Sequence, residues 1–150
     1  MASPHIITRN LVILVVLFTT AAFIIEKDAL HKKKYSVQIT EFRDGKPKPK
    51  TIEDAIEFKD GKVYSDFAAS DKLGFTKFMK YELKKDSTYT EDDVEKRYFE
   101  LESISTNEND ETLYMSIKID DYEIEGSMKL TKGDKPKKYY EFAGKEKVKK

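Results

Sequence analysis

The feature that most constrains this chain is a strict alternation of apolar and polar residues, which begins at Tyr35 and returns in segment after segment. The clearest case is the stretch LYMSIKI at positions 113–119, where apolar side chains occupy every second position. A β-strand points successive side chains to opposite faces, so this period predicts strands with one buried face. The pattern therefore favours a sheet with a single apolar side and almost no helix.

Eight such segments follow one another along the chain, separated by turn or loop segments. We expect strands at 35–39, 52–58, 63–64, 79–83, 99–104, 113–119, 122–130 and 139–144. Asp60-Gly61 is a strong signal for a two-residue hairpin turn. We expect loops over 44–50 and 132–138, a loop or a short turn of helix over 67–75, and a brief capped helix or an acidic loop at 90–93.

Short turns between consecutive strands predict an all-β, antiparallel meander of about eight strands. A meander with one apolar face removes its unpaired edges by closing, so we expect a closed or partly open barrel. A sandwich of two sheets is the alternative fold. The barrel is preceded by an apolar N-terminal helix in this prediction.

That N-terminal segment is a run of fifteen uncharged residues, from Leu11 to Ile25, with Arg9 before it. A helix of this length spans about 22 Å, which is short against a hydrocarbon core of about 30 Å. A positive start, a short apolar centre and small residues at its end are typical of a signal peptide, with cleavage after Ala22. A retained anchor at 11–25 is the second interpretation, and a buried core helix is the third.

The chain thus divides into four parts. Residues 1–27 are a signal peptide or short membrane anchor, 28–34 a polar linker, 35–147 the β domain and 148–150 a basic tail. We expect export to the periplasm or the cell exterior, with attachment to a membrane if the segment is not cleaved. The total lack of Cys excludes a lipoprotein anchor and any disulfide.

Composition also removes several classes of function. Lys and Arg total 28 and Asp and Glu total 28, whereas a nucleic-acid binder usually carries a strongly basic balance. The two histidines, His5 and His31, precede the β domain. Thiolate and imidazole are the groups that most transition-metal sites and nucleophilic triads use, so we expect no enzyme, no cofactor and no metal site.

Asn107, Asn109 and Glu111 are spaced like oxygen ligands for calcium, but a plain hairpin turn is the preferred interpretation because the glycine that a calcium loop needs is absent. The basic stretches at 46–50 and 145–150 could contact anionic lipid head groups; a solvated loop and tail are preferred.

The remaining signal is aromatic and sulfur-rich: nine Tyr, nine Phe and several Met. Inward-facing side chains of this kind either fill a narrow barrel or line a cavity for an apolar ligand. The residues expected to line such a cavity are Met79, Tyr81, Leu83, Phe99, Leu101, Met115, Ile117, Met128 and Phe142.

The strand count, the Asp60-Gly61 hairpin and the closing pair of segments at 122–130 and 138–144 carry a resemblance. Over 35–147 the chain resembles the small lipocalin-like domains of exported bacterial proteins. The resemblance implies a barrel that binds a small apolar molecule, or one kept only as a scaffold. We therefore expect a non-enzymatic exported barrel that binds a small hydrophobic ligand or lipid; the alternative is a cell-envelope structural or interaction module with a filled core.

Overall fold

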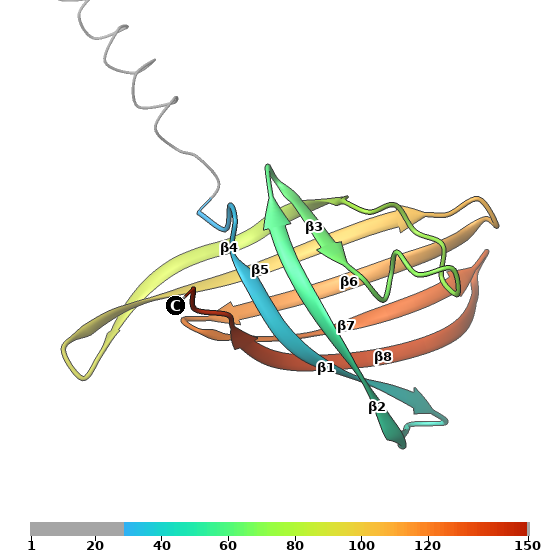
Figure 1. The fold of residues 1–150 in the computed structure, drawn as a ribbon, viewed down its shortest axis with the longest axis horizontal. Helices are drawn as coiled ribbons and strands as arrows, with labels where there is room; N and C mark the ends of the chain where they lie inside the picture. The colour runs from blue at the N-terminus through green and yellow to red at the C-terminus, as the bar shows by residue number, and fades with distance from the viewer. Residues whose placement is uncertain (1–28, 150) are drawn as a thin grey trace, which may run out of the picture.

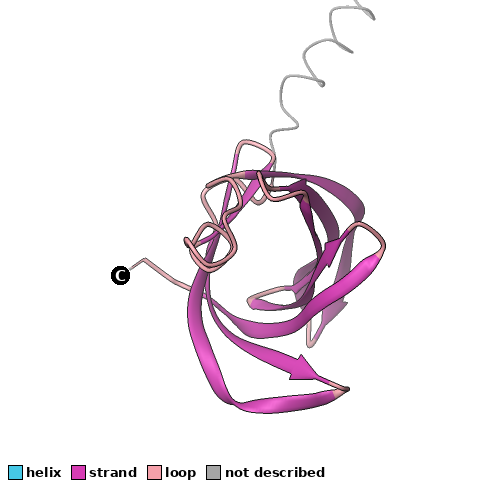
Figure 2. Ribbon diagram, turned by 90° about the vertical axis from the view of Figure 1, so that its right-hand side faces the viewer, coloured by secondary structure: helices cyan, strands magenta, loops and turns pink. Residues whose placement is uncertain are grey.

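The computed structural model of this chain describes residues 29–149. Its strands are β1 Lys34–Arg43, β2 Lys46–Lys59, β3 Lys62–Ser65, β4 Met79–Glu91, β5 Val94–Thr106, β6 Glu111–Asp120, β7 Glu123–Lys132 and β8 Lys135–Glu146. Each strand pairs antiparallel with the next, and β8 pairs with β1, so the strand order is that of a closed barrel (Figures 1 and 2). The predicted meander of eight antiparallel strands is confirmed. The predicted apolar helix at 11–25 lies outside the described residues.

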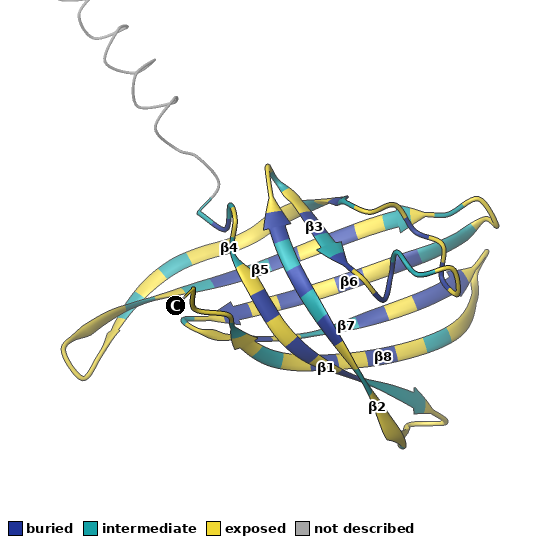
Figure 3. Cartoon of the chain, viewed as in Figure 1, coloured by how far each residue is buried: buried dark blue, intermediate teal, exposed yellow. Residues whose placement is uncertain are grey.

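The period of two decides which face of each strand is covered. On β1, Tyr35, Val37 and Ile39 are buried while the residues between them are exposed, and β6 repeats the pattern. Figure 3 shows this alternation along most strands of the ring. The buried faces meet inside the ring and form one hydrophobic core.

Several strands are longer than predicted: β4 continues to Glu91, and β2 begins at Lys46 and β8 at Lys135, where polar loops were expected. Pro47 and Pro136 lie in the extensions of β2 and β8, beside irregularities in strand register. Proline is tolerated at strand ends and bulges, where its missing N–H removes no ladder hydrogen bond. The extensions form because backbone pairing continues beyond the last apolar side chain.

Two-residue turns close several of the hairpins. The predicted turn at Asp60-Gly61 is confirmed, with Lys59 opposite Lys62 and positive φ at both turn residues. The segment at 90–93 is neither a helix nor a long loop: Asp92 and Asp93 form a two-residue turn between β4 and β5.

We call the two ends of the ring proximal and distal. The proximal end carries residues 29–33, the β2–β3 and β6–β7 turns and the end of β8; the distal end carries the β1–β2, β5–β6 and β7–β8 turns and the loop 66–78. The weakest seam is between β3 and β4, which share only the pairs Lys62–Lys80 and Val63–Met79. Beyond this seam the β4–β5 hairpin extends away from the ring (Figure 1).

Candidate ligand site inside the strand ring

Most of the side chains predicted to line a ligand cavity do face the interior of the ring. At most 3% of the surface of each is exposed in seven of them: Met79, Phe99, Leu101, Met115, Ile117, Met128 and Phe142. All seven belong to the single core cluster. The structure therefore brings these predicted residues together.

Their burial also describes the space between them. A side chain that lined a chamber wide enough for water would keep accessible surface on that side, as a bound ligand requires. These side chains keep almost none, and the largest ones in the core, Tyr35, Tyr140 and Phe58, are buried to the same degree. Side chains thus fill the interior.

Tyr81 and Leu83 behave differently from the others. Tyr81 packs against the core from its edge, with its ring 5.7 Å from that of Phe58. Leu83 is 47% exposed, so its assignment to a cavity wall is wrong. It lies opposite Leu101 on β5, but β3 pairs with β4 only near Met79. Leu83 therefore has no third strand to cover it.

The proximal end of the interior is closed by the segment that enters β1. Leu30 is 1% exposed and belongs to the core, although residues 28–34 were predicted to be a polar linker. The Lys32 amide donates to the Phe58 carbonyl at 2.8 Å, and the Phe58 amide donates to the Lys33 carbonyl at 2.9 Å. These two bonds fix the turn that places Leu30 over the core.

The distal end is closed by the loop 66–78, whose apolar side chains Phe67, Ala68, Leu73 and Phe75 are buried in the core. Asp54 of β2 and Ser65 of β3 hold the start of this loop. The Ser65 hydroxyl donates to the Asp54 carboxylate at 2.6 Å, and the Phe67 amide donates to the same carboxylate at 3.3 Å.

Asp54 was not singled out from the sequence, although it occupies an inward position in register with Ile56. Burial raises the pKa of its carboxyl, and the hydrogen bond from Ser65 opposes that rise. The sequence did contain a signal for this site, because Asp54 occupies the same alternate positions as the apolar residues Ile56 and Phe58.

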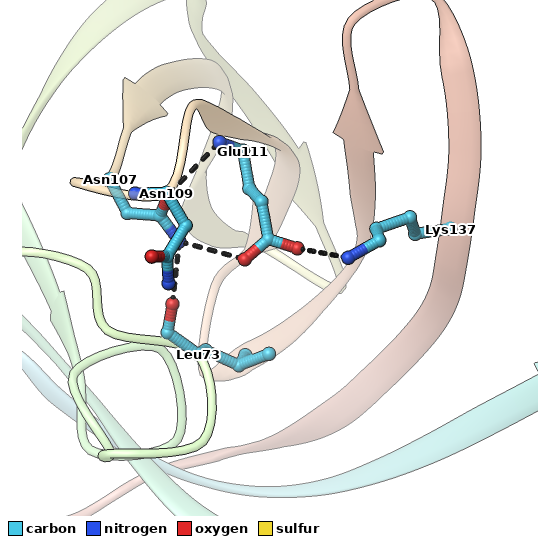
Figure 4. Close-up of polar contacts among 5 residues, drawn as sticks. All are labelled: Leu73, Asn107, Asn109, Glu111 and Lys137. Atoms are coloured by element: carbon cyan, nitrogen blue, oxygen red, sulfur yellow. Dashed lines mark hydrogen bonds and ion pairs between the residues drawn. The ribbon is translucent and has the colours of Figure 1, made fainter.

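A polar network connects the distal loop to the two neighbouring hairpins (Figure 4). The Asn107 side-chain amide donates to the Leu73 carbonyl at 2.8 Å and to the Glu111 carboxylate at 3.2 Å. The ammonium of Lys137 on β8 donates to the other oxygen of Glu111 at 2.8 Å, and this bond holds the pKa of the Glu111 carboxyl below its usual value.

At this turn, where calcium ligands were considered, the side-chain oxygen of Asn107 is occupied by backbone hydrogen bonds. The side-chain oxygen of Asn107 accepts from the amides of Asn109 and Glu111, at 2.9 and 3.0 Å. It therefore acts as a turn cap. Within residues 29–149 no group of three or more acidic, His or Cys side chains is arranged to hold a metal ion.

Two polar atoms inside the ring stand out. The hydroxyl groups of Tyr35 and Tyr140 are buried and have no hydrogen-bond partner among the described residues. Burial raises the pKa of both phenols, that of Tyr140 to about 12. A buried hydroxyl group without a hydrogen bond lowers stability, so each of these two groups marks a point in the interior where hydrogen bonding is incomplete.

The hollows of the surface lie mainly outside the core. Two adjoining hollows, of about 740 and 680 Å³, are lined largely by outward-facing polar side chains of β1, β6, β7 and β8, and share Gln38, Lys118 and Glu125. Both are open to solvent, unlike the enclosed apolar cavities that bind hydrophobic ligands.

A scan against protein-family models and searches of curated proteins and solved structures return no match to this chain. Between residues 29 and 149, no helix is long and apolar enough to cross a membrane.

Proposed function

We propose that this protein is a non-catalytic module of the cell envelope that binds no ligand inside its ring and works through its outer surface. The observation that carries the proposal is the burial of the inward side chains from Phe99 to Phe142, which leaves no chamber at the positions where an apolar ligand would lie. Both ends of the interior are also covered, by Leu30 and by the loop 66–78.

The outer surface is suited to contacts with other molecules. Charged residues make up 37% of the chain, and on β6 and β7 they occupy outward positions. Several large apolar side chains also remain exposed, among them Ile104 at 63% and Tyr114 at 44%. Exposed apolar side chains beside charged ones are common in transient protein interfaces.

A second candidate is a carrier of a small hydrophobic molecule or lipid, as the lipocalin-like resemblance implies. The observation in its favour is the pair of unpartnered hydroxyls of Tyr35 and Tyr140. A ligand with a polar group could satisfy one of them, but only if the core rearranged to admit it.

Displacement of a fluorescent apolar dye by fatty acids separates the two candidates. The wild-type chain should bind neither at micromolar concentration. The Met128→Ala variant is a matched control, because it removes most of a fully buried side chain and leaves a cavity in the core. Circular dichroism should show that this variant is still folded. Saturable binding by the wild type would overturn the proposal; binding by the Met128→Ala variant alone would support it.

Export is also part of the proposal, and it depends on the apolar run at 11–25. N-terminal sequencing of the mature protein tests it. A first residue of Phe23 would establish cleavage after Ala22, whereas Met1 or Ala2 at the start would eliminate the signal-peptide interpretation.

A further inference from the structure

The position of Leu30 limits how far the ring can lie from the apolar segment. Leu30 is buried at the proximal end, and Ala29 packs beside it. Only three residues lie between Ile25, the last residue of the apolar run, and Ala29, so four residue steps join them. Because a chain spans at most about 3.6 Å per residue, this connection reaches about 14 Å. A membrane that holds the apolar run must therefore lie close to the proximal end.

Three lysines form a row across the strands at this same end. Lys59 on β2 lies directly opposite Lys62 on β3, and Lys62 lies directly opposite Lys80 on β4. All three are exposed, and none forms an ion pair with a residue in the described part of the chain. Like charges on opposed residues destabilise a sheet, so cross-strand attraction does not explain this row.

Other lysines extend the same basic surface. Lys32 and Lys34 are exposed next to the entry of the chain, and the Lys147 amide donates to the Lys34 carbonyl at 2.8 Å, which brings the C-terminal segment alongside. Acidic residues lie nearby as well: Asp60 contacts His31 at 3.3 Å, Glu146 lies 3.7 Å from Lys33, Glu57 lies opposite Lys34, and Glu82 lies two positions after Lys80 on β4. The row itself contains lysines alone.

We propose that the proximal end docks on a membrane surface, with Lys59, Lys62 and Lys80 facing anionic lipid head groups. With the apolar run retained in a membrane, the short connection keeps the proximal end within about 14 Å of it, which favours a lipid surface over any other anionic partner. Each lysine near a charged membrane favours binding about fivefold, so the row of three favours the docked orientation about a hundredfold at low salt.

The distal end supplies a matched control for this surface. Lys132 and Lys135 also lie opposite each other beside a turn, and Lys46 is exposed at the neighbouring turn. These three lysines resemble the proximal row in charge and exposure. They differ in their place, at the far end of the ring from Leu30.

The test uses the full chain in lipid vesicles. Because the sequence has no Cys, a fluorophore can be attached at a single introduced one, at Val148→Cys for the proximal end or at Asp134→Cys for the distal end. Quenching by a lipid with a spin-labelled head group reports which end faces the membrane. The vesicles contain phosphatidylcholine alone, or phosphatidylcholine with phosphatidylglycerol as the minor component.

We expect stronger quenching at position 148 than at 134, and a larger difference in anionic vesicles than in phosphatidylcholine alone, where only the tether acts. Replacing Lys59, Lys62 and Lys80 together by Gln should remove the gain seen in anionic vesicles, as should molar salt, whereas replacing Lys46, Lys132 and Lys135 by Gln should not. Equal quenching at the two probes, no gain in anionic vesicles, or an unchanged triple variant would overturn the proposal. Failure of the full chain to float with the vesicles would overturn it as well. None of these results depends on whether the interior binds a ligand.

Discussion

Replacing Gly144 with alanine tests the closure of the ring where β8 meets β1. Gly144 lies opposite Val37 on β1 and opposite Ile124 on β7. A Cβ atom added to Gly144 would lie 1.8 Å from the carbonyl oxygen of Ser36 and 2.7 Å from the Cα of Val37. Both are backbone atoms, so no side chain can turn away to make room.

The size of the effect follows from that distance. Ordinary contact for a Cβ begins at 3.4 Å, so β1 and β8 must separate by about 1.6 Å, the difference between 3.4 and 1.8 Å. A ladder hydrogen bond of about 2.9 Å does not survive such a shift. The loss of two or three bonds at about 1 kcal/mol each, together with the strain of overpacking, predicts a loss of about 3 kcal/mol in the free energy of unfolding.

Urea titration followed by far-ultraviolet circular dichroism measures this loss. The control is Gly133→Ala, at a turn where φ is +58° and no atom lies within 4 Å of the added Cβ. That variant suffers only backbone strain, about 1 kcal/mol. If Gly144→Ala were no more destabilising than Gly133→Ala, the close approach of β1 and β8 would be refuted.

Three further predictions concern the interior and its distal closure. Tyr35→Phe removes an unpartnered buried hydroxyl and should leave the free energy of unfolding unchanged or raise it by up to about 1 kcal/mol; a clear loss in urea titration would mean that the hydroxyl has a partner. The pKa of the Asp54 carboxyl is raised in the folded state, so the ionised carboxylate lowers the free energy of unfolding at a pH above that pKa. This loss of stability disappears as the pH falls towards the pKa that Asp54 has in the unfolded chain. When the pH is lowered from 7 to 4, the free energy of unfolding of the wild type should therefore rise relative to that of Asp54→Asn. A difference that does not change with pH would contradict the raised pKa of Asp54. Asn107→Ala should cost about 2 kcal/mol in thermal unfolding and accelerate hydrogen exchange of the amides in loop 66–78, because it removes the bond to the Leu73 carbonyl. Asn107→Asp keeps the oxygen that caps the turn but places a carboxylate oxygen against the Leu73 carbonyl and the Glu111 carboxylate, so it should lose at least as much.

Several features of the fold were predictable because they depend on local rules. The alternation at 113–119 predicted β6 and its buried face, since the period of a strand is set by backbone geometry alone. Asp60-Gly61 predicted a hairpin because few residues adopt positive φ easily. The lengths of β2 and β8 were not predictable, because their polar extensions are held by backbone bonds to neighbouring strands and not by apolar side chains.

The candidate site shows the same division. The sequence by itself determined that residues such as Met115 and Phe142 face inward, because their phase along the strand leaves no other choice. Only the tertiary structure decided that they meet and fill the interior, that Leu83 remains uncovered beside the short β3, and that Leu30 and the loop 66–78 close the ends. It also placed Lys59, Lys62 and Lys80 in one row. The physical reason is that a strand carries its own period, whereas its partners, register and neighbours across the ring depend on the path of the whole chain.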